Sequence, residues 1–109
     1  MQAFTLADAL ARQGASGNPW LELLSVPDLS AGLYVLPAGG IDRQHPHTED
    51  EVYVVLAGSA RFTAGDATRD VAAGDTLFVP AHEPHRFHDI AEELRLLVVF
   101  GPAEGSRAG

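Results

Sequence analysis

The sequence contains no cysteine, and this absence removes several kinds of chemistry at once. Disulfide bonds, thiolate metal ligands and cysteine nucleophiles are all excluded. The lack of disulfides fits a cytoplasmic protein, and we expect that location. The N-terminus lacks a basic start, and Asp8 and Arg12 interrupt its apolar residues, so it does not resemble a signal peptide.

Positive charge and long apolar runs are also scarce. There are 7 Lys and Arg residues against 15 Asp and Glu residues, which gives a formal net charge of −8. A surface that binds nucleic acid or anionic lipid needs clustered positive charge. No apolar run approaches the length of a membrane span. We therefore expect neither nucleic acid nor a membrane as a partner, and a small-molecule ligand in their place.

The chain has 109 residues, of which 46% are hydrophobic, enough to build the core of one domain. We expect a single domain over residues 1–109, with a barrel core at about 20–100. So short a chain with an internal ligand cavity would gain from covering apolar surface against a second copy. Residues 94–100 carry apolar side chains on both faces of a predicted strand, so we expect a homodimer.

The pattern along the chain predicts one short helix followed by strands. Residues 4–13 read as an amphipathic helix that Thr5 or Asp8 could cap. After it, apolar and β-branched runs alternate with clusters of Gly, Pro and Asp, which is typical of a β-sandwich or a closed barrel. The predicted strands are 20–25, 32–36, 51–56, 60–63, 68–71, 76–79, 85–88 and 94–100. The tail, residues 101–109, is expected to fray.

The most informative stretch carries two histidines and a glutamate. His45 and His47 are two residues apart, so on a strand both imidazoles would leave the same face. Glu51 follows a short turn and opens the next run, where an antiparallel neighbour would bring its carboxylate beside the two rings. If the barrel closes, His85 can supply a fourth ligand from far along the chain.

Three imidazoles and one carboxylate suit a divalent first-row metal ion: iron, manganese, nickel, cobalt, copper or zinc. Four protein ligands in a six-coordinate site would leave two positions for water, oxygen or a chelating substrate. Such openness distinguishes a reactive site from a closed structural one. A purely structural metal is the alternative.

These residues also fall into two spaced motifs. The first runs Gly39, five residues, His45-Pro46-His47, three residues, Glu51, six residues, Gly58. The second runs Gly74, five residues, Pro80-Ala81-His82, two residues, His85, three residues, Asp89. Together they resemble the two motifs of the cupin family. This sequence departs from the family pattern at two positions: His82 stands where the family has Gly, and Asp89 stands where it has Asn. Neither departure falls on a ligand position of the family pattern.

The resemblance implies an all-β fold, a cupin double-stranded β-helix or jelly-roll barrel, with the short helix at its N-terminus and the metal inside near one open end. Metal-bearing cupins include many dioxygenases, and also decarboxylases, isomerases, lyases and cyclases. The first hypothesis is a metal-dependent dioxygenase acting on a small organic molecule, in which Glu51 also serves as the catalytic base. The alternatives are a non-catalytic binding or sensing module and a metal-dependent isomerase or epimerase.

Alternation along the predicted strands suggests which other side chains surround the metal. Tyr53, Phe87, Leu96 and Val98 are expected to line the substrate pocket, which would suit a modest, partly aromatic or aliphatic ligand. His82 and His88 are interpreted as surface histidines, with Arg86 and His88 facing outward. Trp20 and Tyr34 fit equally well on an inner sheet face or in a dimer interface.

Overall fold

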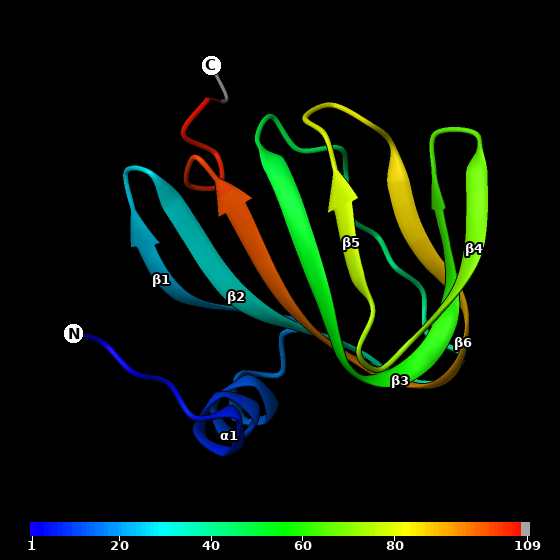
Figure 1. Cartoon of the computed structure of the whole chain (residues 1–109). Helices are drawn as coiled ribbons and strands as arrows, with labels where there is room; N and C mark the ends of the chain where they lie inside the picture. Colours follow the sequence, from blue (N-terminus) through cyan, green and yellow to red (C-terminus); the bar gives the residue numbers. More distant parts are fainter. Residues whose placement is uncertain (108–109) are drawn as a thin grey trace.

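We describe the protein from a computed structural model, which describes residues 1–107. It contains one helix and six strands (Figure 1). In chain order these are α1 (Leu6–Ser16), β1 (Trp20–Val26), β2 (Leu29–Leu36), β3 (Asp50–Ala64), β4 (Ala67–Ala72), β5 (Thr76–Val79) and β6 (His85–Gly101).

The helix lies two to three residues further along the chain than the pattern predicted. Thr5 is its N-cap, and the Thr5 hydroxyl accepts a hydrogen bond from the Asp8 backbone N–H at 3.1 Å, as capping chemistry requires. Gly17 ends the helix in the left-handed conformation, at φ 68°. Ala9 faces inward and packs against Leu33 and Val35 of β2, so the helix covers part of the outer face of the sheet.

Two pairs of predicted strands are in fact continuous. The runs at 51–56 and 60–63 form the single strand β3, and the runs at 85–88 and 94–100 form the single strand β6. The expected break at 57–59 is a series of register shifts between β3 and β6. Bulges of this kind bend a strand without ending it, and they use the same turn-like residues as a loop, so the sequence pattern does not distinguish the two.

The long antiparallel pair of β3 and β6 forms the frame of the barrel. The strand order is β1-β2-β6-β3-β4, and β5 pairs with β3. The first part of β3 lies between β5 and the end of β6, whereas its last part lies between β4 and the start of β6. Because both long strands curve together, the sheet folds over on itself and encloses an interior (Figure 1).

Gly58 stands where β3 bends. Its φ is 91°, a left-handed conformation that disfavours side chains, and a Cβ atom here would lie 2.1 Å from the Glu93 carbonyl oxygen. The position therefore combines an unusual backbone conformation with close approach of β6, and only glycine meets both requirements.

Alternation along the long strands holds as predicted. Glu51, Tyr53 and Val55 all face the interior, as do His85 and Phe87, while Arg86 points outward. Tyr53, Phe62 and Phe87 form an aromatic cluster in the core, with ring centroids 4.5 to 5.8 Å apart. The described residues contain no helix with the length and apolar character needed to cross a bilayer.

Candidate metal centre and its pocket

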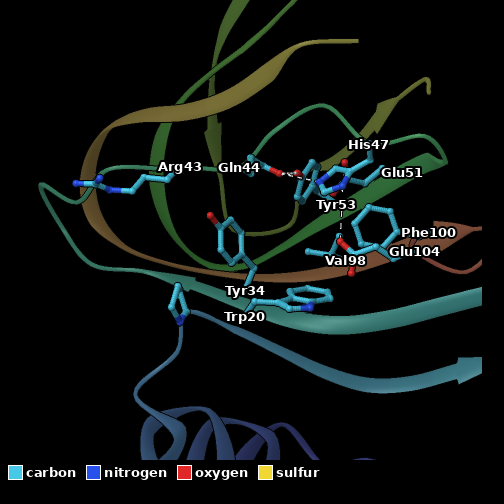
Figure 2. A pocket seen from close by; sticks show the side chains of 11 residues that line it. Trp20, Tyr34, Arg43, Gln44, His47, Glu51, Tyr53, Val98, Phe100 and Glu104 are labelled. Atoms are coloured by element: carbon cyan, nitrogen blue, oxygen red, sulfur yellow. Dashed lines mark hydrogen bonds and ion pairs between the residues drawn. The ribbon is translucent and has the colours of Figure 1, made fainter. Parts of the chain in front are cut away.

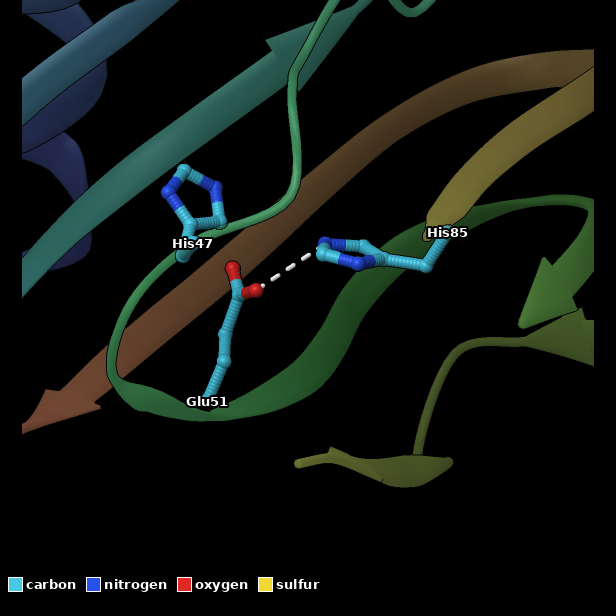
Figure 3. A group of neighbouring side chains, drawn as sticks. All are labelled: His47, Glu51 and His85. Atoms are coloured by element: carbon cyan, nitrogen blue, oxygen red, sulfur yellow. Dashed lines mark ion pairs between the residues drawn. The ribbon is translucent and has the colours of Figure 1, made fainter. Parts of the chain in front are cut away.

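Three of the four predicted metal ligands come together at the open end of the barrel. His47 lies in the loop before β3, Glu51 near the start of β3, and His85 at the start of β6 (Figure 3). Each of the three residues offers one nitrogen or oxygen atom as a ligand, and these three atoms all lie within 4.8 Å of one another. Glu51 and His85 are buried, with 2% and 8% of their surface exposed, and His47 is half-buried.

The surroundings of the Glu51 carboxylate are those of a group that could hold a cation. Its Oε1 lies 3.0 Å from His85 Nε2, which is an ion-pair distance. Oε1 is buried, and it has no hydrogen-bond partner among residues 1–107. A buried carboxylate oxygen without a partner is costly. A metal ion between the carboxylate and the two imidazoles would remove that cost.

His85 is oriented by a backbone carbonyl. Its Nδ1 lies 2.8 Å from the Glu83 carbonyl oxygen, and because a carbonyl can only accept, Nδ1 carries the proton. Nε2 is therefore the atom that faces Glu51 and that would bind a metal, an arrangement common among metal-binding histidines.

The two imidazoles have pKa values shifted in opposite directions. Burial lowers the pKa of His47, against the opposing pull of the Glu51 carboxylate. For His85, burial also acts to lower the pKa, but the neighbouring Glu51 carboxylate and the Glu83 carbonyl outweigh it and raise the pKa overall.

The structure does not bring His45 to this group. His45 is exposed, and the segment that carries it is a loop and not a strand. The expectation that His45 and His47 project from one strand face is therefore wrong. In this loop Gln44 and His47, three residues apart, both line the same pocket, so the alternation of a strand does not apply.

A buried aspartate, which no sequence motif distinguishes, organises the inner end of the site. Asp42 is 8% exposed. Its Oδ1 accepts from the Tyr34 hydroxyl at 2.6 Å, and its Oδ2 accepts from Gln44 Nε2 at 2.6 Å and from the Phe87 backbone N–H at 2.9 Å. Nothing in the local pattern distinguishes this residue from other aspartates that lie on the surface.

The Asp42 interactions continue to the metal centre. Gln44 Oε1 accepts a hydrogen bond from the Tyr53 hydroxyl at 2.7 Å, and the same hydroxyl lies 3.0 Å from His85 Nε2. Burial, followed by the nearby carboxylates, raises the pKa of both Tyr34 and Tyr53. Both phenols therefore stay protonated at neutral pH and act as hydrogen-bond donors.

A pocket of about 280 Å³ opens beside the His47, Glu51 and His85 group (Figure 2). Of the four predicted pocket residues, Tyr53 and Val98 line it. Phe87 and Leu96 do not, because their inward side chains are 1% and 0% exposed and are taken up in the core. The other lining residues are Pro19, Trp20, Tyr34, Arg43, Gln44, His47, Glu51, Phe100 and Glu104. Trp20 and Tyr34 thus lie on the inner face.

The C-terminal segment forms part of the pocket wall and is held in place, contrary to the expectation that it frays. The buried carboxylate of Glu49 accepts hydrogen bonds from the backbone N–H groups of Gly105 and Arg107, at 2.9 and 3.1 Å. The Ser30 hydroxyl accepts one from the Glu104 backbone N–H at 2.8 Å. Burial acts to raise the pKa of Glu49, but these backbone bonds and one from the Thr48 hydroxyl lower it overall. Residues 108 and 109 lie outside the described part of the chain.

The remaining histidines lie outside the metal group. His88 is half-buried on the outer face, with Nε2 2.7 Å from the Thr63 hydroxyl and Nδ1 2.7 Å from Asp89. His82 is exposed, and its backbone N–H donates to the His47 carbonyl at 2.7 Å. Its φ of 68° is left-handed, so this residue keeps the conformation that glycine adopts most easily.

Comparisons with known proteins agree with this geometry. Residues 32–100 match the family model described as a cupin domain. The chain is 46% identical over 104 residues to an uncharacterised protein of Streptomyces coelicolor. The match covers 95% of this chain and 99% of the relative. It is 38% identical over 58 residues to a dimethylsulfoniopropionate lyase of Ruegeria pomeroyi, covering 52% of this chain and 29% of that protein.

The fold also matches solved structures. An RmlC-like cupin of Methanocaldococcus jannaschii with a double-stranded β-helix fold superposes with a TM-score of 0.70 at 20% identity. The match covers 76% of this chain and 78% of that one. At this identity the likeness concerns the fold alone.

Proposed function

The chain belongs to the cupin family, and we propose that it is a metal-dependent enzyme acting on a small organic molecule, with oxygenase chemistry as its reaction class. The observation that carries the proposal is the ligand set itself. Two histidines and one carboxylate meet beside an open pocket. This set, with open coordination positions, is typical of non-haem iron oxygenases.

Each residue of the site has a part in this proposal. His47, Glu51 and His85 would hold the metal, which when bound would supply a Lewis acid and a place for oxygen and substrate to meet. Glu51 is also the group that would accept a proton from the substrate, because its carboxylate lines the pocket. The Tyr53 hydroxyl, held by Gln44, would orient a polar substrate group.

An oxygen-independent lyase is the second candidate. It is favoured by the partial similarity to the Ruegeria lyase and by the placement of the Tyr53 hydroxyl 3.0 Å from His85 Nε2. A hydroxyl beside the metal group, next to a carboxylate that can accept a proton, suits proton removal followed by loss of a leaving group. The two candidates differ in whether oxygen is consumed.

The first test is the metal content of untagged protein purified without chelator, measured by plasma mass spectrometry. We expect about one equivalent of iron or another first-row metal per chain. His85→Ala should lose most of it, whereas the matched variant His88→Ala, a histidine outside the group, should keep it. Less than a tenth of an equivalent in the parent protein, with no uptake on reconstitution, would contradict the proposal.

The second test separates the reaction classes. Metal-loaded protein is incubated with panels of small organic acids and zwitterions in an oxygen electrode, and the products are followed by mass spectrometry. Metal-dependent oxygen uptake supports the oxygenase. Metal-dependent product formation without uptake supports the lyase or an isomerase, and binding without conversion supports a sensing module.

A further inference from the structure

One end of the pocket is walled by aromatic rings. Trp20 stands edge to face against Tyr34, with centroids 6.3 Å apart at 72°, and against Phe100, with centroids 6.1 Å apart at 80°. Figure 2 shows Trp20 and Tyr34 below the metal group and Phe100 beside it. All three rings line the cavity. Aromatic faces around a cavity attract organic cations through their quadrupoles.

The same end carries a carboxylate that no arginine neutralises. Glu104 lines the pocket, and its side chain is 30% exposed. Among the described residues, the basic group within ion-pair distance is His47, whose Nδ1 lies 3.6 Å from Glu104 Oε2.

Further acidic residues surround Glu104. Glu51 lines the same pocket as Glu104, and the Glu49 carboxylate accepts a hydrogen bond from the backbone N–H of Gly105, the residue that follows Glu104. Arg43 also lines the cavity, but it lies on the opposite side from Glu104 and its guanidinium extends away from that end (Figure 2).

We propose that this end of the pocket binds the positively charged part of a small organic ligand, such as a methylated ammonium group, between the rings of Trp20, Tyr34 and Phe100 and the carboxylate of Glu104. The inference rests on the proposed function, since it identifies the substrate class of the same site. A substrate of this class would carry oxygen ligands for the metal at one end and the cation at the other.

A simpler role for Glu104 would be to orient His47 for metal binding. At 3.6 Å the two side chains are too far apart for a hydrogen bond. The two roles also predict different results. An orienting residue would affect the affinity for metal, whereas a cation-binding residue would affect the preference for charged over neutral ligands.

The experiment compares choline with its uncharged isostere 3,3-dimethylbutan-1-ol. The chain contains a single tryptophan, Trp20, and it lines the pocket, so its fluorescence reports on ligands there. We expect choline to bind about tenfold more tightly than the alcohol, which corresponds to about 1.4 kcal/mol. Equal affinity, preference for the alcohol, or no binding of either compound would overturn the inference.

Two variants then each remove the negative charge of one carboxylate, one inside the pocket and one outside it. Glu104→Gln should lower the affinity for choline about fivefold and leave the affinity for the alcohol unchanged. Glu92→Gln removes an exposed carboxylate outside the pocket and should change neither. If Glu104→Gln lowers both affinities equally, or lowers neither, Glu104 does not bind the cation.

The same titrations are run on metal-loaded and chelator-treated protein, so that the inference and the proposed function can fail separately. A chain that prefers choline but takes up no metal would contradict the enzyme proposal. A chain that binds metal at His47, Glu51 and His85 but shows no preference for choline would contradict the present inference.

Discussion

The two ends of the barrel interior hold different kinds of side chain. Toward the bend of β3 and β6 the interior is apolar and closed, with Val55 and Leu94 at 1% and 0% exposed. At the open end, the same two strands bury Glu51 and His85, and one carboxylate oxygen there has no hydrogen-bond partner among residues 1–107.

This difference separates the part of the barrel that stabilises the fold from the part that carries chemistry. Apolar burial lowers the free energy of the folded state at the bend. A buried carboxylate without a partner does the reverse, and such a feature persists where function requires it. Substitutions at the two ends should therefore change different observables.

The largest effect is expected at the bend. Leu94→Ala removes a fully buried side chain and leaves a cavity, so the free energy of unfolding should fall by about 2 to 5 kcal/mol in urea denaturation. The milder Leu94→Val should cost less and, once folded, bind metal with unchanged affinity. A change in metal affinity in the valine variant would show that the two ends are coupled.

The next effect concerns metal binding at the open end. His47→Ala removes one of three ligands and should weaken the affinity for the metal about a hundredfold, by competition with a chelating dye. The neighbouring exposed residue gives the control, because His45→Ala should change the affinity less than about threefold. Equal losses in the two variants would mean that His45 joins the ligand set when the metal is bound.

A smaller loss of stability is expected from substitutions of Asp42 and Tyr34, which lie between the two ends of the interior. Asp42→Asn replaces one accepting oxygen by an N–H donor that must face existing donors, so we expect a loss of about 1 to 3 kcal/mol in thermal or urea unfolding. Tyr34→Phe removes only one of the hydrogen bonds to Asp42 and should cost about 1 kcal/mol or less. If the asparagine variant were as stable as the parent, the Asp42 hydrogen bonds would not support the site.

The smallest effect is expected at the loop that touches the metal ligand His47. His82 has a φ of 68°, so His82→Gly relieves backbone strain, partly offset by the greater freedom of glycine in the unfolded chain. We expect a net gain of about 0.5 kcal/mol in thermal unfolding, with metal binding unchanged. A clear loss of stability would show that the imidazole has a stabilising contact of its own.

Much of this molecule was predictable from local pattern. The strand at 76–79, the Thr5 cap and the inward faces of β3 and β6 all follow from periodicity and capping chemistry. Glu51 and His85 were found because they lie on regular strands, where a spacing of two residues determines which side chains share a face. The motif spacing indicated the family in the same way.

Other features depended on segments without regular periodicity. His45 and His47 lie in a loop, where the number of residues between two side chains does not determine whether they point the same way. The role of Asp42 arises from a bond to the backbone of Phe87, 45 residues away in the chain. The bends in β3 and β6 could not be told from turns because bulges and loops use the same residue types.

By itself, then, the sequence determined the all-β fold and the family, and it predicted all three residues of the assembled group together with His45, because these depend on repeats of two residues and on spaced motifs. Only the tertiary structure decided that His45 lies apart from His47, Glu51 and His85, that Phe87 and Leu96 belong to the core, and that Trp20, Tyr34 and Glu104 surround the pocket. The physical reason is that a pocket is made by chain segments distant in sequence, whose mutual placement is set by the closure of the barrel.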